Sequence, residues 1–545
     1  MKTKPPARVP LLWILLPLII GIVFGRLFPF AHFYLLIGPS LILGILAWKA
    51  SARQPKQWAY FVVSSLLIVG YCYTNFADKK NKPRNNFPER EANLSIEITR
   101  LFEGDESKRK GIGKIIATET HLEDIQEAKV FFSLYPPPDS EFSDSIVAGS
   151  SIQAIGRLRP ISLKDASSNG FLSYLANSGV AFQFDRGIVL STQEQTNHWN
   201  SRFSSILSWA NDSLSYGVDS DSPYTHAYTA MLLGIKSELD DDQKTLFLQS
   251  GALHIFAISG LHIGVIAACG HALFLLLRIP KAWIPIPNIL LIGLFVLSTG
   301  GAPSAWRALL MIACLYLCLA TKRQSASLNA LVLSALICLL INPLQLFLAG
   351  FQMSYATVSA ILLYGVPLAE QLNEHWNPFE SLPRKAWALT HKSVHNAGRF
   401  LIGSFAISLS AFLASSALSI IYFNTLPLIG ILANIILLPL ASLVIISGFI
   451  SLAFASIGLT HIVSLFNHAA QVVLWIMHAL LSKLGAIKGS HLTFSEPPAL
   501  ILYLFLSILL VGMLLGYNRN WDLPKPYLWA LPVVYSGLCI TVAFL

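Results

Sequence analysis

The sequence predicts a mostly α-helical, polytopic membrane protein with about 13 transmembrane helices and a small extracytoplasmic β-barrel domain. Of the 545 residues, 54% are hydrophobic and only 12% are charged, whereas a soluble globular protein is about 25% charged. Apolar stretches long enough to cross a bilayer recur along the chain, and one segment holds nearly all the acidic residues. This composition excludes a soluble enzyme and a disordered chain.

Thirteen apolar stretches are candidate spans, since a span needs about 20 mostly apolar residues. They lie at 10–28, 31–48, 57–76, 251–278, 283–299, 303–320, 325–342, 345–368, 400–422, 428–457, 462–482, 498–517 and 527–545. No small-residue cleavage site follows the first stretch, so we expect a retained helix rather than a signal peptide. The 428–457 run contains Pro439 and is too long for a plain span, which predicts a broken or re-entrant helix.

The segment 77–249 has a different composition from the rest of the chain. It carries 18 basic and 24 acidic residues, a net charge of −6. The rest of the chain carries 20 basic and 5 acidic residues, a net charge of +15. Five short runs rich in β-branched residues predict strands at 92–102, 111–120, 128–135, 146–159 and 180–189. Five such strands favour a small barrel or sandwich, and the OB-fold is one option. We therefore expect three N-terminal helices (1–76), an OB-like domain (77–199), an amphipathic helical connector (200–249) and a transmembrane channel domain (250–545).

Basic residues in short loops predict the orientation, because they are enriched on the cytoplasmic side. With the N-terminus in the cytoplasm, sixteen basic residues of the short loops lie inside, and only Arg26, Lys483 and Lys488 lie in the opposite loops. Three spans then place 77–249 outside the cytoplasmic membrane.

Arg307 is the most conspicuous charge within a predicted span. It follows a Gly-Gly-Ala-Pro-Ser break, where a helix is expected to begin. An arginine at the centre of a span costs about 2.5–3.5 kcal/mol. Two interpretations stay open: Arg307 lines a polar path for an anion, or its side chain extends to the membrane interface.

Three further polar groups interrupt apolar runs. His254, Ser259, Gly260 and His262 form the first; Ser259 and His262 have the spacing of a nucleophile pair, but no acid partner lies in any span, and hydrogen bonding between packed helices is the simpler interpretation. Gln352, Tyr355 and Ser359 share a helical face, with Ser354 beside it, and suit either a wetted path or helix–helix contacts. Asn434 lies between Pro427 and Pro439, which again predicts a discontinuous helix.

No cofactor or metal is expected. The six cysteines lie in apolar stretches without a CxxC pair, and no phosphate-binding Gly-Lys-Ser/Thr loop occurs. No carboxylate lies within a span, which disfavours a cation-coupled carrier. A path for a polyanion is better tolerated, because no buried acid would repel it.

Together these segments resemble the ComEC family of competence proteins, the inner-membrane DNA-uptake channels of naturally transformable bacteria. The resemblance covers about residues 1–480. It includes Asn169, Gly170, Phe171, Tyr174 and Leu175 in the external segment. In the membrane domain the matching motifs, in order, are MLLGIKSEL, GALHIFAISGLHIG, GGAPSAWRALLM, NPLQLFLAGFQMSYATV and LPLIGILANIILLPLASL.

The resemblance implies a non-enzymatic channel that carries single-stranded DNA inward across the bacterial cytoplasmic membrane. Its implied partners are the bilayer, a DNA receptor outside, a cytoplasmic helicase-like motor and a separate nuclease, because the family's metallo-β-lactamase-like domain and its H-x-H-x-D-H motif do not occur in this sequence. The residues carried over as the DNA path are His254, Ser259, Gly260, His262, Arg307, Gln352, Ser354, Tyr355 and Asn434.

An external DNA contact needs a local basic patch, because the segment as a whole is acidic. The candidates are Lys108, Arg109, Lys110, Lys114, Arg157 and Arg159, although the first four also suit a solvated loop. Aromatic residues for stacking are Phe131, Phe132, Tyr135, Tyr174 and Phe182, and core packing is the simpler interpretation for most of them. Two alternatives stay open: a permease for a smaller anionic or lipid-linked substrate, and a membrane-embedded Ser/His hydrolase.

Overall fold

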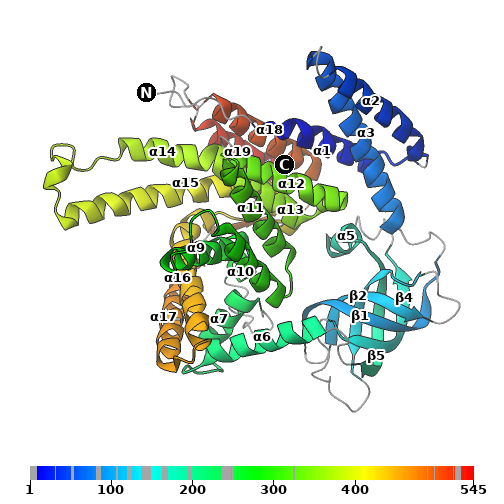
Figure 1. Cartoon of the computed structure of the whole chain (residues 1–545), viewed down its shortest axis with the longest axis horizontal. Coiled ribbons are helices and arrows are strands. Elements are labelled where there is room, and N and C mark those ends of the chain that lie inside the picture. The colour runs from blue at the N-terminus through cyan, green and yellow to red at the C-terminus, as the bar shows by residue number, and fades with distance from the viewer. Residues whose placement is uncertain are drawn as a thin grey trace.

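A computed structural model gives the fold (Figure 1). It describes residues 9–30, 32–50, 55–81, 87–105, 108–118, 125–136, 149–161, 170–193, 198–234, 247, 251, 253–256, 258–322, 326–485, 487, 489–495, 497–519, 521 and 529–544. Asn169 and residues 235–239 of the MLLGIKSEL motif lie outside the described residues.

Each predicted apolar stretch contains a helix. Among the described residues, eight helical segments are long and apolar enough to cross a membrane: Phe33–Ala50 (η1 and α2), Lys56–Asp78 (within α3, Pro55–Asn81), Pro303–Ala320 (α11), Ala349–His375, Leu389–Phe423 (α15), Gly430–Ala455 (α16), Thr460–Gly485 (α17) and Ala499–Asn518 (α18). Five shorter apolar helices complete the set: α1 (Leu12–Leu27), α9 (Gly260–Leu276), α10 (Pro285–Ser298), α12 (Ala326–Ile341) and α19 (Leu531–Phe544).

Two of these helices differ from the prediction in their extent. The 251–278 stretch is divided into the short 3-10 helix η4 (Leu253–Ile255) and α9, which begins at Gly260. The 428–457 stretch is one continuous helix, α16, with Pro439 inside it, so the expected break was wrong. Packing of α16 against α17 and α9 on either side holds the proline-containing turn in the helix.

The long Ala349–His375 segment is not uniformly α-helical. It follows a short 3-10 elbow, η5 (Pro343–Phe347), and consists of α13 (Ala349–Ala360), a π-helical turn η6 (Ile361–Gly365) and α14 (Val366–His375). After the short turn η7 (Arg384–Ala386), α15 runs back for 35 residues. At 1.5 Å per residue it is about 52 Å long, well beyond the roughly 30 Å hydrocarbon core. The α14–α15 hairpin therefore projects from the bundle (Figure 1).

The five predicted strands form a closed barrel. They are β1 (Arg90–Asp105), β2 (Lys108–Thr118), β3 (Lys129–Tyr135), β4 (Ser151–Pro160) and β5 (Val180–Gln193), in the order β1-β2-β3-β5-β4, with β4 returning to β1. All pairs are antiparallel except β3 with β5.

Strand alternation fills the barrel. Side chains at every second position are fully buried, as with Leu94, Ile96 and Ile98 on β1 and Phe132 and Leu134 on β3. Alternate residues point to opposite faces of a strand, so one set builds the core and the other reaches the outer surface. A Cβ at Gly156 would lie 2.8 Å from the Cα of Gly187, so β4 and β5 approach closely there only because both residues are glycines.

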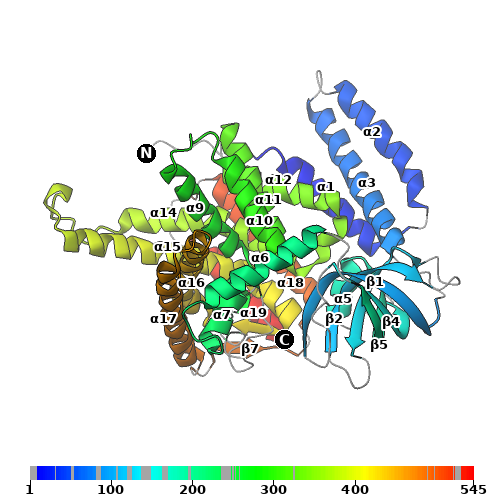
Figure 2. The ribbon, with the colours of Figure 1, turned by 60° about the horizontal axis from the view of Figure 1, so that its bottom comes forward.

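One helix lies within the barrel segment, and two more lead from the barrel to the bundle. Between β4 and β5 the chain forms α5 (Gly170–Asn177), which the sequence analysis did not predict and which covers the outside of the barrel (Figure 2). After β5 come α6 (His198–Ser215) and α7 (Pro223–Leu233), which ends at the left-handed Gly234. Both helices lie within the predicted 200–249 connector, of which 235–246 and 248–249 lie outside the described residues. A two-stranded sheet, β6 (Thr425–Pro427) with β7 (His491–Thr493), was also not predicted.

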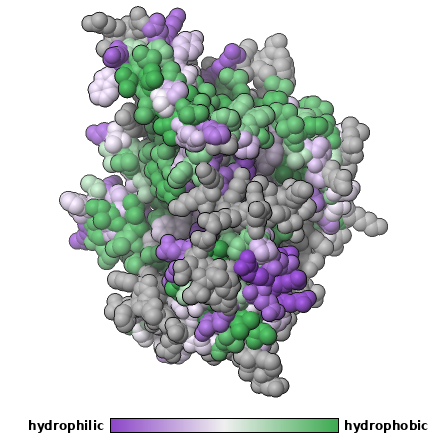
Figure 3. Space-filling model, turned by 90° about the vertical axis from the view of Figure 1, so that its right-hand side faces the viewer, coloured by the Kyte–Doolittle hydropathy of each residue, from purple (hydrophilic) through white to green (hydrophobic). Residues whose placement is uncertain are grey.

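The barrel and the N-terminal helices share one side of the molecule. In a view of that side (Figure 3), hydrophobic side chains cover much of the upper part and strongly hydrophilic ones gather in the lower part. The upper part corresponds to α1–α3 and the lower part to the barrel (Figure 1). This separation is the one expected where a membrane region meets a water-exposed domain.

Candidate functional site

A groove runs over the outer surface of the barrel beside α5. It consists of two adjoining hollows of about 620 Å³ and about 260 Å³ that share Lys108, Ser133 and Asp185. We call this feature the barrel groove. The larger hollow is also lined by Arg100, Phe102, Lys110, Phe131, Phe171 and Gln183, and the smaller by Glu89, Tyr135, Arg157, Arg159 and Arg186. Its larger hollow falls within the range of about 300–1,000 Å³ typical of ligand sites.

Strand periodicity brings the groove residues together. Lys108 and Lys110 are two apart on β2, Phe131 and Ser133 on β3, and Arg157 and Arg159 on β4. Residues two apart share a face of a strand, and their neighbours Phe132 and Leu158 fill the barrel core instead. The barrel therefore presents several parallel rows of outward side chains to one surface.

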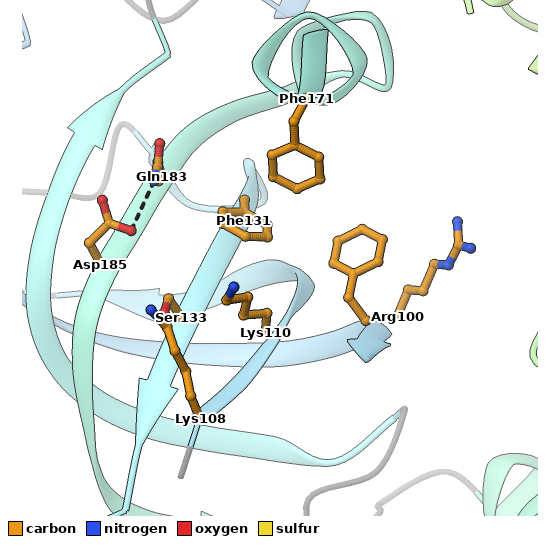
Figure 4. Close-up of a pocket in the computed structure, with 9 residues that line it drawn as sticks. Arg100, Lys108, Lys110, Phe131, Ser133, Phe171, Gln183 and Asp185 are labelled. Carbon is orange, nitrogen blue, oxygen red and sulfur yellow. Dashed lines mark hydrogen bonds between the residues drawn. The ribbon is translucent and has the colours of Figure 1, made fainter. Parts of the chain in front are cut away.

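Aromatic rings form one wall of the barrel groove. Phe171 hangs from α5 over Phe131 (Figure 4), with ring centroids 5.2 Å apart in an edge-to-face arrangement. Phe102 of β1 lies 6.1 Å from both rings. Phe131 is buried beneath the cluster, whereas Phe171 is 46% exposed. The exposed ring is thus held in place by its neighbours, and part of its surface faces solvent at the edge of the groove.

The groove is electropositive. Six of its lining residues are basic and two are acidic. Arg157 pairs with Glu89 at 2.9 Å and Arg159 with Asp185 at 3.3 Å, while Gln183 bridges Arg159 and Asp185. Within the described part of the chain, Lys108 and Lys110 form no ion pair. Lys108 instead places its Nζ 5.0 Å from the centre of the Tyr135 ring. The groove therefore concentrates positive charge in a segment whose sequence is acidic overall.

The structure brings four of the six predicted external basic residues into the groove: Lys108, Lys110, Arg157 and Arg159. Arg109 and Lys114 do not line it. Arg109 alternates with Lys108 and Lys110 and is paired in register with Leu134 of the barrel core, and Lys114 forms an ion pair with Glu127. Of the predicted aromatic residues, Phe132 and Phe182 are buried in the barrel core, while Phe131 and Tyr135 line the groove.

Sequence reasoning missed about half of the groove. Arg100, Phe102, Phe171, Gln183, Asp185 and Arg186 come from β1, α5 and β5. The period-two spacing of Lys108 with Lys110 and of Arg157 with Arg159 was a usable signal within each strand. No local signal shows which strands lie side by side, or that α5 closes one end of the groove.

In the helical bundle, Arg307 occupies the predicted helix start. Gly300 and Gly301 have positive φ angles, and α11 begins directly after them at Pro303. The Arg307 side chain is 7% exposed and donates from Nη2 to the Gly350 carbonyl at 2.9 Å. A Cβ at Gly350 would lie 3.2 Å from that nitrogen, so a glycine suits this contact. Nε of Arg307 is buried and, among the described residues, has no hydrogen-bond partner.

Gln352 and Tyr355 form hydrogen bonds to neighbouring helices, which is one of the two interpretations that the sequence left open. The Oε1 of Gln352 accepts from the hydroxyls of Tyr422 at 3.0 Å and Tyr503 at 3.1 Å, and its Nε2 donates to the Leu346 carbonyl of η5. Tyr355 donates to Ser334 of α12 at 3.3 Å. Ser354 and Ser359 are half-buried on the same helix.

Ser259 and His262 form a helix cap. Ser259 is the N-cap of α9, its backbone N–H donates to His262 Nδ1 at 3.3 Å, and its Oγ lies 3.0 Å from the same nitrogen. This reciprocal arrangement satisfies the first turn of a helix. The structure therefore gives this pair a capping role at the start of α9.

The remaining predicted path residues lie in several different elements. His254 lies in η4, not on the helix of His262, and its Nδ1 is 2.8 Å from the Gly251 carbonyl. Gly260 is the exposed first residue of α9, and Asn434 is half-buried in α16. Across the described ranges, no cluster of three or more His, Cys, Asp or Glu residues is arranged to hold a metal ion.

Comparison with known proteins adds a family match. Residues 231–519, just over half of the chain, match the family model described as Competence protein. A curated relative, ComE operon protein 3 of Bacillus subtilis (strain 168), is 26% identical over 318 residues. The match covers 58% of this chain and 36% of that relative, so the chain spans about a third of the relative's length. No solved structure matches the chain.

Proposed function

Because this chain belongs to the Competence protein (ComEC) family, we propose that it carries single-stranded DNA across the bacterial cytoplasmic membrane during natural transformation. The observation that carries the proposal is the barrel groove, in which six basic side chains lie beside a cluster of aromatic rings that includes the exposed Phe171. A single strand presents phosphates that need cations and bases that stack on flat rings. The groove offers both on one surface.

In this proposal the barrel receives the strand outside the membrane. A closed five-stranded barrel with β3 parallel to β5 is compatible with an OB-like fold, an architecture that commonly binds oligonucleotides on its outer strands. All thirteen apolar helices cross the membrane, with the N-terminus in the cytoplasm and residues 77–249 outside. The excess of basic residues in the loops assigned to the cytoplasm supports this orientation.

The polar residues of the bundle are proposed to line the inward route: His254, Ser259, Gly260, His262, Arg307, Gln352, Ser354, Tyr355 and Asn434. Arg307 is the strongest member. It is a buried cation that forms no ion pair with any of the described residues, and an unpaired buried charge is costly. A phosphate that passes close to the guanidinium would remove that cost, so the site favours a polyanion over a cation.

The chain acts in this scheme as a conduit with no reaction of its own. An external DNA receptor, a cytoplasmic helicase-like motor and a separate nuclease are proposed as partners, on the family resemblance alone. The bilayer is the one partner that the apolar helices directly require.

The test is complementation in a naturally transformable host. Deleting the gene should abolish transformation while DNA still binds the cell surface, and the wild-type gene should restore it. Arg307→Ala should fail to restore it, whereas Lys281→Ala, an exposed loop substitution, should succeed. A deletion that leaves transformation intact but impairs growth or uptake of a small anion would refute DNA transport and favour a permease.

A further inference from the structure

Arg26 lies where the barrel, the N-terminal helices and the central bundle meet. Its Nη1 donates to both carboxylate oxygens of Asp78 on α3, at 2.6 and 2.8 Å. Its Nη2 donates to Oδ1 of Asn177 at the end of α5, at 3.2 Å. The guanidinium carbon lies 5.7 Å from the ring centre of Phe347 in η5. One side chain of α1 thus contacts three other elements.

Two of the elements that Arg26 contacts, α5 and η5, also contact or carry candidate functional residues. At the barrel end, α5 carries Phe171, the exposed wall of the groove, and Tyr174, whose hydroxyl accepts from Arg100 at 3.3 Å. At the bundle end, the η5 elbow provides the Leu346 carbonyl that anchors Gln352. The elements α5 and η5 also pack directly against each other.

The side chains at this junction are largely buried and joined by hydrogen bonds. The Asp78 and Arg26 side chains are 12% and 26% exposed, and Asn177 is buried. The contact needs an arginine, because a planar guanidinium with several N–H donors can hold a carboxylate and an amide at the same time, which a lysine ammonium on a flexible stem does less well. Tyr73 of α3 adds a second tie by donating to the carbonyls of Leu340 and Ile341, just before η5.

We propose that Arg26 is the positioning residue that holds the α5 wall of the barrel groove against the η5 elbow, so that the groove is aligned with the bundle. This inference rests on the function proposed above. It requires that loss of the Arg26–Asn177 contact impairs transport of the strand without impairing its capture.

The test uses substitutions at Asn177, because they leave the Arg26–Asp78 ion pair intact. Asn177→Ala removes the acceptor, whereas Asn177→Asp keeps an acceptor oxygen in place. Ser173→Ala, one turn earlier on α5, is the matched control; its hydroxyl contacts Asn177 only through Nδ2, at 3.5 Å. Arg26→Lys keeps the charge opposite Asp78 but loses the planar fork.

Asn177→Ala and Arg26→Lys should lower transformation about tenfold, the effect of losing one hydrogen bond to a charged group. Both purified full-length variants should bind a labelled oligothymidylate within twofold of wild type. Asn177→Asp and Ser173→Ala should behave as wild type in both assays. Equal loss of binding and transformation in Asn177→Ala would instead mean that α5 has lost its structure, and would overturn the inference, as would normal transformation.

Hydrogen exchange separates this inference from the proposed function. In the DNA-free protein, amides of α5 and of η5 should exchange faster in Asn177→Ala than in wild type or Ser173→Ala. Unchanged exchange in both elements refutes the junction whatever the protein transports. Faster exchange together with no transformation defect on gene deletion would refute the proposed function and with it the role of Arg26 in DNA transport.

Discussion

Removing Lys108 and Lys110 together tests whether the barrel groove binds the phosphate backbone. The two lysines project from the same face of β2 into the groove, and the described residues offer neither of them an ion pair. Neither lysine therefore has to release a carboxylate of the described residues before it binds a phosphate. We expect the double substitution Lys108→Ala and Lys110→Ala to weaken binding of single-stranded DNA through loss of counterion release.

The magnitude follows from the number of contacts. Each phosphate neutralised on a single strand contributes about −0.7 to the slope of log K against log salt, so two lost contacts reduce the slope by about 1.4. Between 1 M and 0.1 M salt this corresponds to about 25-fold in affinity, or about 2 kcal/mol. Arg157 and Arg159 in the second hollow should contribute less to phosphate binding, because each already forms an exposed ion pair with a carboxylate.

The assay is fluorescence anisotropy of a labelled oligothymidylate with the purified full-length protein at several salt concentrations. Lys114→Ala is the control: it removes a lysine from the same strand that pairs with Glu127 and lies outside the groove, so its slope should match wild type. A double variant with the wild-type slope would show that the phosphates do not lie against β2, and the groove would lose its role.

Three further substitutions have expected outcomes. Phe171→Ala should lower the affinity for the same oligonucleotide about 5- to 150-fold, which is the contribution of one stacked base. The salt dependence of binding should not change, and a changed slope would contradict stacking. Phe132→Ala leaves a cavity in the barrel core, where the Phe132 side chain is fully buried. It should lower the free energy of unfolding by about 3–5 kcal/mol, so that proteases cleave the barrel at temperatures where the wild-type barrel resists them. Asn467→Ala removes an amide that donates to the carbonyls of Ser213 and Tyr216 and accepts from Ser451. It should lower stability by about 1–3 kcal/mol for each group left unsatisfied. An unchanged melting temperature would argue against this contact between α6 and the bundle.

The sequence was informative wherever the signal is local. Long apolar runs predict helices because the bilayer and the protein interior both reward burial of apolar side chains, and each predicted run contains one. Alternation within short runs predicts strands, and all five barrel strands occur near the expected positions. The glycines before Arg307 likewise mark a helix start through backbone geometry alone.

Local signals failed where neighbouring elements decided the outcome. Pro439 predicts a break, yet α16 continues because α9 and α17 pack against it. The spacing of Ser259 and His262 is equally compatible with a nucleophile pair and a capping box, and only the position of the first turn of α9 distinguishes them. The spacing of Gln352 and Tyr355 likewise left a wetted path and helix–helix contacts open, and the hydrogen bonds to neighbouring helices depend on how those helices pack.

The amino-acid sequence alone determined the membrane-embedded class, the separate β domain and the basic pairs on β2 and β4, because composition and periodicity depend only on residues close together in the chain. The tertiary structure decided which of those pairs meet. Closure of the barrel brings Lys108 of β2, Phe131 of β3 and Arg159 of β4 to one groove, and α5 adds Phe171. It also placed Arg26 between α3, α5 and η5. Contacts between residues more than a hundred positions apart, such as Arg26 and Asn177, depend on how whole elements pack, and no local pattern encodes them.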